Sequence, residues 1–153
     1  LVYTLSLHDA LPISAGRTGE MYYSLGAEDD QKYREAVTAF QSVLESEIAT
    51  GRQKEMARYR LAKAYEKLGN SETALHTYLD IVYSYDVAVE DGNVPDWFYF
   101  ARSGYDAARL LLLQEEYRRA ARIYERIAET GIPTADDALA KAREIRRQHG
   151  LND

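Results

Sequence analysis

The sequence contains no cysteine, only three prolines and no long apolar run. Without cysteine the chain forms no disulfide, thiolate metal site or thiol nucleophile, and this absence fits the cytoplasm and an envelope compartment equally. The richest apolar stretch, 107–113, is interrupted by Arg109 and falls short of the roughly 18 residues that a membrane span needs. We therefore expect no membrane span, and the compartment stays open.

Charge limits the possible partners. The sequence has 19 basic and 25 acidic residues, for a net charge of −6, which repels a phosphate backbone. We therefore expect no nucleic-acid partner. The apolar share of 46% is ordinary for a globular chain, and 153 residues are enough to bury a core in one unit.

Residues 3–13 resemble the translation of a sequencing adapter over eleven consecutive positions. The competing interpretation is the apolar core of a signal peptide, but no Lys or Arg precedes the segment and no small-x-small cleavage pattern follows it. We therefore expect residues 1–14 to be a non-native or disordered tail, and we expect native sequence upstream of Ser14 to be missing. On this interpretation the sequence is a metagenomic fragment.

Turn signals divide the remainder of the chain into helices. The alternation of β-branched residues that would indicate strands is almost absent. Glycine tolerates positive φ and proline stops a helix, so Gly51, Gly69 and Pro133 mark breaks. We expect a loop insert over 86–96 and an N-cap at Thr134. The expected helical spans are 17–26, 31–49, 52–68, 71–85, 95–114, 116–130 and 134–149.

One pattern of a small, an aromatic and an aliphatic residue occurs three times, at spacings of four and then three positions. These spacings place the three residues on one face of a helix. The small residue permits close approach of a neighbouring helix, and the aromatic ring fills the space between hairpins. The occurrences are Ala36, Phe40 and Val43; Ala74, Tyr78 and Ile81; and Ala120, Tyr124 and Ile127.

The middle occurrence belongs to a longer signature. The stretch Leu61-Ala62-x2-Tyr65-x2-Leu68-Gly69-Asn70-x3-Ala74-Leu75-x2-Tyr78-x2-Ile81 resembles the tetratricopeptide repeat nearly position for position. A second unit over 107–127 resembles it more loosely, because Leu111 stands where the family prefers tyrosine. The resemblance implies an all-α fold in which antiparallel helical hairpins stack as a short right-handed solenoid. The longer hairpins are similar to those of bacterial envelope assembly proteins.

This resemblance also implies boundaries and a binding surface. It predicts repeats over 15–133, at about 15–50, 52–86 and 95–131, and a capping helix with a tail over 134–153. In the family, the first helices of successive hairpins line a groove that holds a protein or peptide. Carried over by register, the groove residues are Tyr59, Lys63, Lys67, Arg102, Tyr105 and Arg109, with Met56, Glu66 and Leu112 at further positions.

A tyrosine followed four residues later by a cation suits an extended peptide that carries carboxylates. The alternative, that Tyr59 and Tyr105 only pack between helices, stays open. The sequence identifies neither the partner nor the oligomeric state. Lys63 stands where the family's carboxylate clamp has asparagine, so chaperone-tail binding is not implied.

The sequence offers little for catalysis. Outside the adapter-like segment the histidines are His76 and His149, and neither has neighbours that make a site. The acidic residues of the insert lack the ligand order of a calcium loop. No phosphate-binding glycine loop, nucleophile elbow or metalloprotease motif occurs. We expect no enzymatic activity, no catalytic residue, no metal and no cofactor.

Two functions follow from these patterns. One is a scaffold module that binds a peptide or helix in the groove. The other is the structural C-terminal end of a longer, possibly envelope-associated solenoid, whose face at Phe40, Val43 and Leu44 packs on upstream repeats. We also expect Trp97 and Phe100, one turn apart, to anchor the insert on the core, with an exposed aromatic patch as the alternative.

Overall fold

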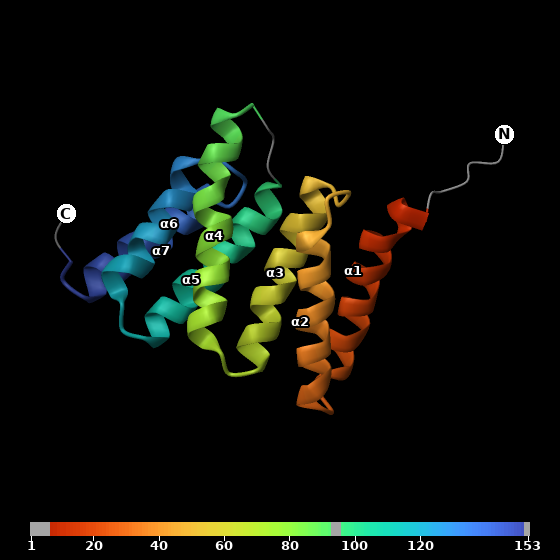
Figure 1. Cartoon of the computed structure of the whole chain (residues 1–153). Helices are drawn as coiled ribbons and strands as arrows, with labels where there is room; N and C mark the ends of the chain where they lie inside the picture. Colours follow the sequence, from red (N-terminus) through yellow and green to blue (C-terminus); the bar gives the residue numbers. More distant parts are fainter. Residues whose placement is uncertain (1–6, 93–95, 152–153) are drawn as a thin grey trace. The chain divides into compact units, whose positions relative to one another are not determined.

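The computed structural model describes residues 7–92 and 96–151, and in this part of the chain it contains seven helices and no strand (Figure 1). The all-α class predicted from sequence is confirmed. The chain divides after Thr77 into two compact units, a division that falls inside the fourth helix. The helices are α1 (Leu7–Leu25), α2 (Asp30–Glu45), α3 (Gly51–Lys67), α4 (Ser71–Glu90), α5 (Trp97–Leu113), α6 (Tyr117–Glu129) and α7 (Ala135–Gln148).

Local chemistry explains where most helices start and stop. Thr50 caps α3 in a reciprocal capping box, in which its backbone N–H donates to Gln53 Oε1 at 2.8 Å and Gln53 N–H donates to Thr50 Oγ1 at 3.3 Å. Gly69 and Gly131 take positive φ after α3 and α6, as the turn signals predicted. Thr134 occupies the N-cap position of α7, as predicted, but it does not form the predicted capping box. Its φ of −95° and ψ of 6° are not the extended conformation of a cap, and its side chain makes no capping bond.

Two helices are longer than predicted. Helix α1 begins at Leu7 rather than at residue 17, so residues 7–14 are helical, and Pro12 lies inside the helix despite its missing N–H. The adapter origin of this segment stays a prediction, and residues 1–6 lie outside the described residues. Helix α4 ends at Glu90 rather than at residue 85, because no glycine or proline occurs before Gly92. The first part of the predicted loop insert is therefore helix.

In the first unit, α2 packs between α1 and α3 (Figure 1). Its Ala36, Phe40 and Val43 are fully buried, as the repeated pattern predicted. They share a core with Ala57 and Leu61 of α3, and α1 adds partly buried side chains to it, among them Ala15, Tyr22 and Tyr23. The structural alternative predicted that this face of α2 packs on upstream repeats. In the structure α1 covers it.

Glycine sets how closely α1 approaches α2. A Cβ atom built on Gly19 would lie 2.6 Å from the ring of Phe40, and Phe40 is fully buried. A Cβ atom on Gly16 would meet only the methyl end of Met56, at 3.4 Å. Contacts under about 3 Å force a neighbouring group to move in a close-packed core. Gly19 is therefore required by packing, whereas Gly16 is not.

In the second unit, α6 packs against both α5 and α7. Its Ala120, Tyr124 and Ile127 are buried, as predicted. A Cβ atom on Gly104 of α5 would lie 2.6 Å from Ile127 Cδ1, so α5 and α6 also meet at a glycine. The two other members of the pattern in this unit, the α4 residues Tyr78 and Ile81, are buried as well.

Polar contacts fix α7 on α6. The guanidinium of Arg146 donates two hydrogen bonds to the Glu125 carboxylate, from Nε to Oε1 at 2.5 Å and from Nη2 to Oε2 at 3.0 Å. Such a bidentate pair is stronger than a single bond and fixes orientation. Three residues further on, the ring of His149, the C-cap of α7, stacks on Tyr117 at the start of α6, with the ring centroids 3.5 Å apart. Both contacts hold the C-terminal end of α7 on α6.

The aromatic run at the start of α5 is split between core and surface. Phe100 is fully buried and lies 4.0 Å from Tyr85 between ring centroids, so its predicted anchoring role is confirmed. Trp97 is 42% exposed, and the prediction that it anchors beside Phe100 is wrong. Trp97 is the first residue of α5, and its ring instead packs edge-on against Phe98, which is also exposed.

Replacing Gly19 by alanine tests the close packing of α1 on α2. Alanine normally stabilises a helix by up to about 1 kcal/mol relative to glycine, but here the added methyl group collides with Phe40. We expect Gly19→Ala to lower the free energy of unfolding by about 1–3 kcal/mol. The matched variant Gly16→Ala should leave it unchanged or raise it. Chemical denaturation measures both, and equal stabilisation by the two changes would contradict the packing.

Candidate partner-binding surface

Helix α3 carries the predicted groove residues of the first unit. Tyr59 is only 6% exposed, which favours the packing alternative for this side chain. Lys63 is partly exposed and its Nζ lies 3.5 Å from Glu66 Oε1. Lys67 is exposed in the last turn, where its charge complements the helix dipole. The surface of α3 therefore exposes the lysines rather than the tyrosine.

Helix α5 carries the predicted residues of the second unit. Arg102 is exposed, and its guanidinium carbon lies 4.9 Å from the centroid of the Phe98 ring, a cation–π geometry. Arg109 is exposed over 44% of its side chain, and its Nη2 lies 3.3 Å from Asp106 Oδ1. A surface pair of this kind contributes little to stability.

Tyr105 lies between these two arginines and has two roles. Its ring packs edge-on against Tyr124, with centroids 5.2 Å apart, while its hydroxyl donates to Asp137 at the start of α7. Burial, and secondly the hydrogen bond to Asp137, raise the pKa of Tyr105, so the phenol stays protonated and remains a donor. Tyr105 is partly buried, and it therefore packs between helices and also borders the surface.

A cavity of about 460 Å³ opens beside Tyr105 and Arg109. It brings together two cations, Arg109 and Lys141, and a carboxylate, Asp106. Leu113, which is 74% exposed, adds apolar surface at its edge. We call it the α5–α7 cavity, and it is lined by Tyr105, Asp106, Arg109, Leu112, Leu113, Tyr124 and Lys141.

The sequence predicted part of this cavity and missed part of it. Tyr105, Arg109 and Leu112 were placed on the groove by register, and all three line the cavity. Lys141 was missed, because α7 was interpreted as a solvating cap. No pattern in the sequence places Lys141 beside Arg109, because that position depends on how α7 packs in the second unit. Arg102 does not line this cavity.

The described residues hold no obvious chemistry beyond binding. No group of three or more His, Asp or Glu side chains in this part of the chain is arranged to hold a metal ion. None of its helices combines the length and apolar character required to cross a lipid bilayer. The predicted lack of enzymatic activity stays a prediction.

Replacing Tyr105 by phenylalanine tests the bond between α5 and α7. The change removes the donor to Asp137 and keeps the ring. We expect the free energy of unfolding to fall by about 0.5–1.5 kcal/mol, because exposed Asp137 regains water. Tyr124→Phe is the matched control, since the Tyr124 hydroxyl makes no hydrogen bond within the described residues. If thermal denaturation shows the two variants to be equally stable, the bond between α5 and α7 contributes nothing.

Comparison with known proteins agrees with the hairpin architecture. Residues 56–86, which run from α3 into α4, match the tetratricopeptide repeat family. No curated protein and no solved structure matches the chain. The matched residues contain the signature from Leu61 to Ile81 described above, and tetratricopeptide repeats are protein-interaction modules that are typically non-catalytic. Residues 56–86 of this chain are therefore identified as one tetratricopeptide repeat.

Proposed function

We propose that this chain is a scaffold module that binds a peptide segment of another protein through the first-helix surfaces of its hairpins. The observation that carries the proposal is the α5–α7 cavity, where Arg109 and Lys141 border the same space as Leu112 and Leu113. Cations beside apolar surface suit a segment that presents an Asp, a Glu or a C-terminal carboxylate next to an apolar side chain. The cations on α3, Lys63 and Lys67, favour the same chemistry.

The geometry supports binding at low cost in reorganisation. Tyr105 is held by Tyr124 and Asp137, so the wall of the cavity is preformed. Arg109 lies 3.3 Å from Asp106 in an i,i+3 surface contact, and such contacts contribute little to stability. A carboxylate that reaches Arg109 and Lys141 would also gain from being shielded by the two leucines, because the charge-assisted bonds strengthen as water is displaced.

The structural alternative predicted that the α2 face at Phe40, Val43 and Leu44 would pack on absent repeats. Phe40 and Val43 are fully buried and Leu44 is partly buried within the first unit. This covering supports the binding module over the purely structural segment. An envelope-associated role and a bacterial source stay predictions.

Selection from a random peptide display library tests the proposal. We expect the retained peptides to be enriched in Asp or Glu beside Leu, Ile or Phe. For such a peptide, the double change Arg109→Ala and Lys141→Ala should weaken affinity by about 10-fold or more, because two charge-assisted bonds are lost. Fluorescence anisotropy measures the dissociation constants.

The control variant removes two cations elsewhere. Arg118→Ala with Arg122→Ala changes the net charge equally, and both residues are exposed on α6 outside the α5–α7 cavity. The control should bind within about 2-fold of the parent at physiological ionic strength, since distant exposed charges are screened. Equal losses in the two double variants, or selection of no acidic peptide, would defeat the proposal.

A further inference from the structure

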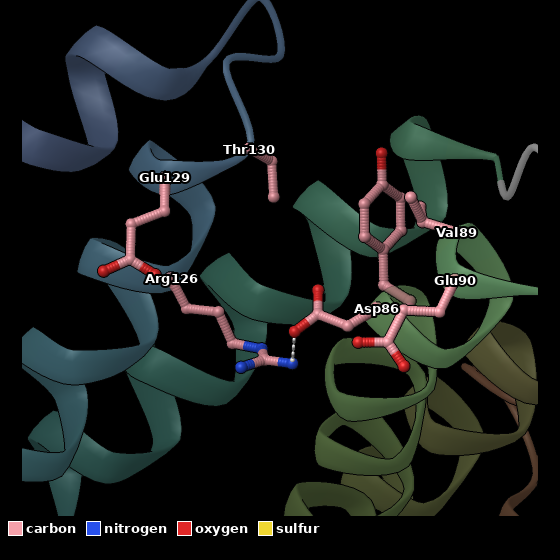
Figure 2. Close-up of a pocket in the computed structure, with 7 residues that line it drawn as sticks. Asp86, Val89, Glu90, Arg126, Glu129 and Thr130 are labelled. Carbon is pink, nitrogen blue, oxygen red and sulfur yellow. Dashed lines mark hydrogen bonds and ion pairs between the residues drawn. The ribbon is translucent and has the colours of Figure 1, made fainter.

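A second cavity lies between the last turns of α4 and α6. It shares no lining residue with the α5–α7 cavity. Its volume is about 410 Å³, and Figure 2 shows side chains from α4 and α6 on its two walls. Only α6 contributes to both cavities, with different residues. We call it the α4–α6 cavity, and it is lined by Tyr85, Asp86, Val89, Glu90, Arg126, Glu129 and Thr130.

The wall formed by α4 is unusually apolar for an exposed helix. Tyr83, Val87 and Val89 are 53%, 58% and 52% exposed, and all three lie in the last turns of α4. Large apolar side chains that gather on a surface mark a contact with another molecule more often than single ones do. Of these three side chains Val89 lines the cavity, and it places exposed apolar surface beside the carboxylate of Glu90.

The cavity has an excess of negative charge that its one cation does not offset. Arg126 is already paired within the protein. Its Nη2 lies 2.5 Å from Asp86 Oδ2 (Figure 2). Its Nε donates to the Val82 carbonyl at 3.4 Å, and its guanidinium lies over the Tyr83 ring. Within the described residues, Glu90 and Glu129 have no ion-pair partner. Two carboxylates are therefore left to attract a cation from outside.

Helix dipoles add to this potential. Glu90 is the last residue of α4 and Glu129 is the last residue of α6. The C-terminus of a helix carries partial negative charge and favours a basic residue, yet α4 has none in its last turn. The carboxylates of Glu90 and Glu129 thus lie where the partial negative charge of each helix C-terminus repels them. A bound cation would reduce both repulsions.

We propose that the α4–α6 cavity is a second docking surface, for a protein segment that inserts an Arg or Lys side chain beside an apolar side chain. The cation pairs with the carboxylate of Glu90 or Glu129, and the apolar side chain covers Val89. This segment has the opposite charge to the one proposed for the α5–α7 cavity, so the two surfaces select different ligands. Charge complementarity and the exposed apolar face together determine this choice of occupant.

A basic probe peptide tests the docking surface. The probe is a short labelled peptide in which Arg alternates with Leu, and its counterpart has Gln in place of Arg. We expect the full chain to bind the Arg peptide, with shifts in NMR signals from the Val89 methyls and the Thr130 amide. Glu90→Gln with Glu129→Gln should weaken binding by about 10-fold, as expected for lost charge-assisted contacts.

The matched control, Glu115→Gln with Glu116→Gln, removes two exposed carboxylates from the turn before α6. It should change binding by less than about 2-fold, because screened charges outside the contact matter little. The variant Glu90→Gln with Glu129→Gln should melt no lower than the parent, which separates lost binding from unfolding. Equal weakening by both double variants would show nonspecific attraction to an acidic protein and overturn the proposal.

Two further readouts identify the occupant. The double change Arg109→Ala and Lys141→Ala should leave binding of the Arg peptide unchanged. This result tests the α4–α6 cavity independently of the α5–α7 cavity. Sedimentation velocity of the parent alone should show no self-association that depends on Glu90 and Glu129. Self-association that the Gln changes abolish would make a second copy of the chain the occupant, and it would overturn docking of a different protein.

Discussion

The close approach of neighbouring helices at small residues is the constraint on which this structure depends. Ala36 and Ala120 in the repeated pattern are fully buried, and Gly19 and Gly104 sit directly against Phe40 and Ile127. At each of the two glycines, an added Cβ atom would collide with the large side chain that packs there. The contacts set the spacing between helices, and through it they decide which side chains can share a cavity.

Much of the fold could be predicted from sequence because the pattern at these contacts is local. Spacings of four and three positions identify a buried helix face wherever they occur, and Ala36, Phe40 and Val43 are buried as expected. The ends of α1 and α4 were less predictable. Glycine marked a stop after α3, but no breaker separates residue 85 from Glu90, so propensity and capping gave no reason for a shorter helix.

The candidate site was predictable only along single helices. Register on α5 placed Tyr105 and Arg109 correctly beside a cavity, because both belong to one periodic face. Lys141 and Tyr124 reach the same space from α7 and α6, and their positions depend on how three helices pack. Trp97 shows that helical spacing alone does not predict burial. Its spacing from Phe100 suits a shared helix face, yet Trp97 is the first residue of α5 and is exposed.

Repeat proteins are commonly treated as strings of exchangeable hairpins, and the α5–α7 cavity qualifies that view. Its walls come from α5, α6 and α7, and the Arg146–Glu125 and Tyr105–Asp137 contacts hold α7 in place. Transplanting the α5–α6 hairpin alone into another scaffold would carry Arg109 along and leave Lys141 behind. The element that recurs in the sequence is two helices long, whereas the cavity is built from three.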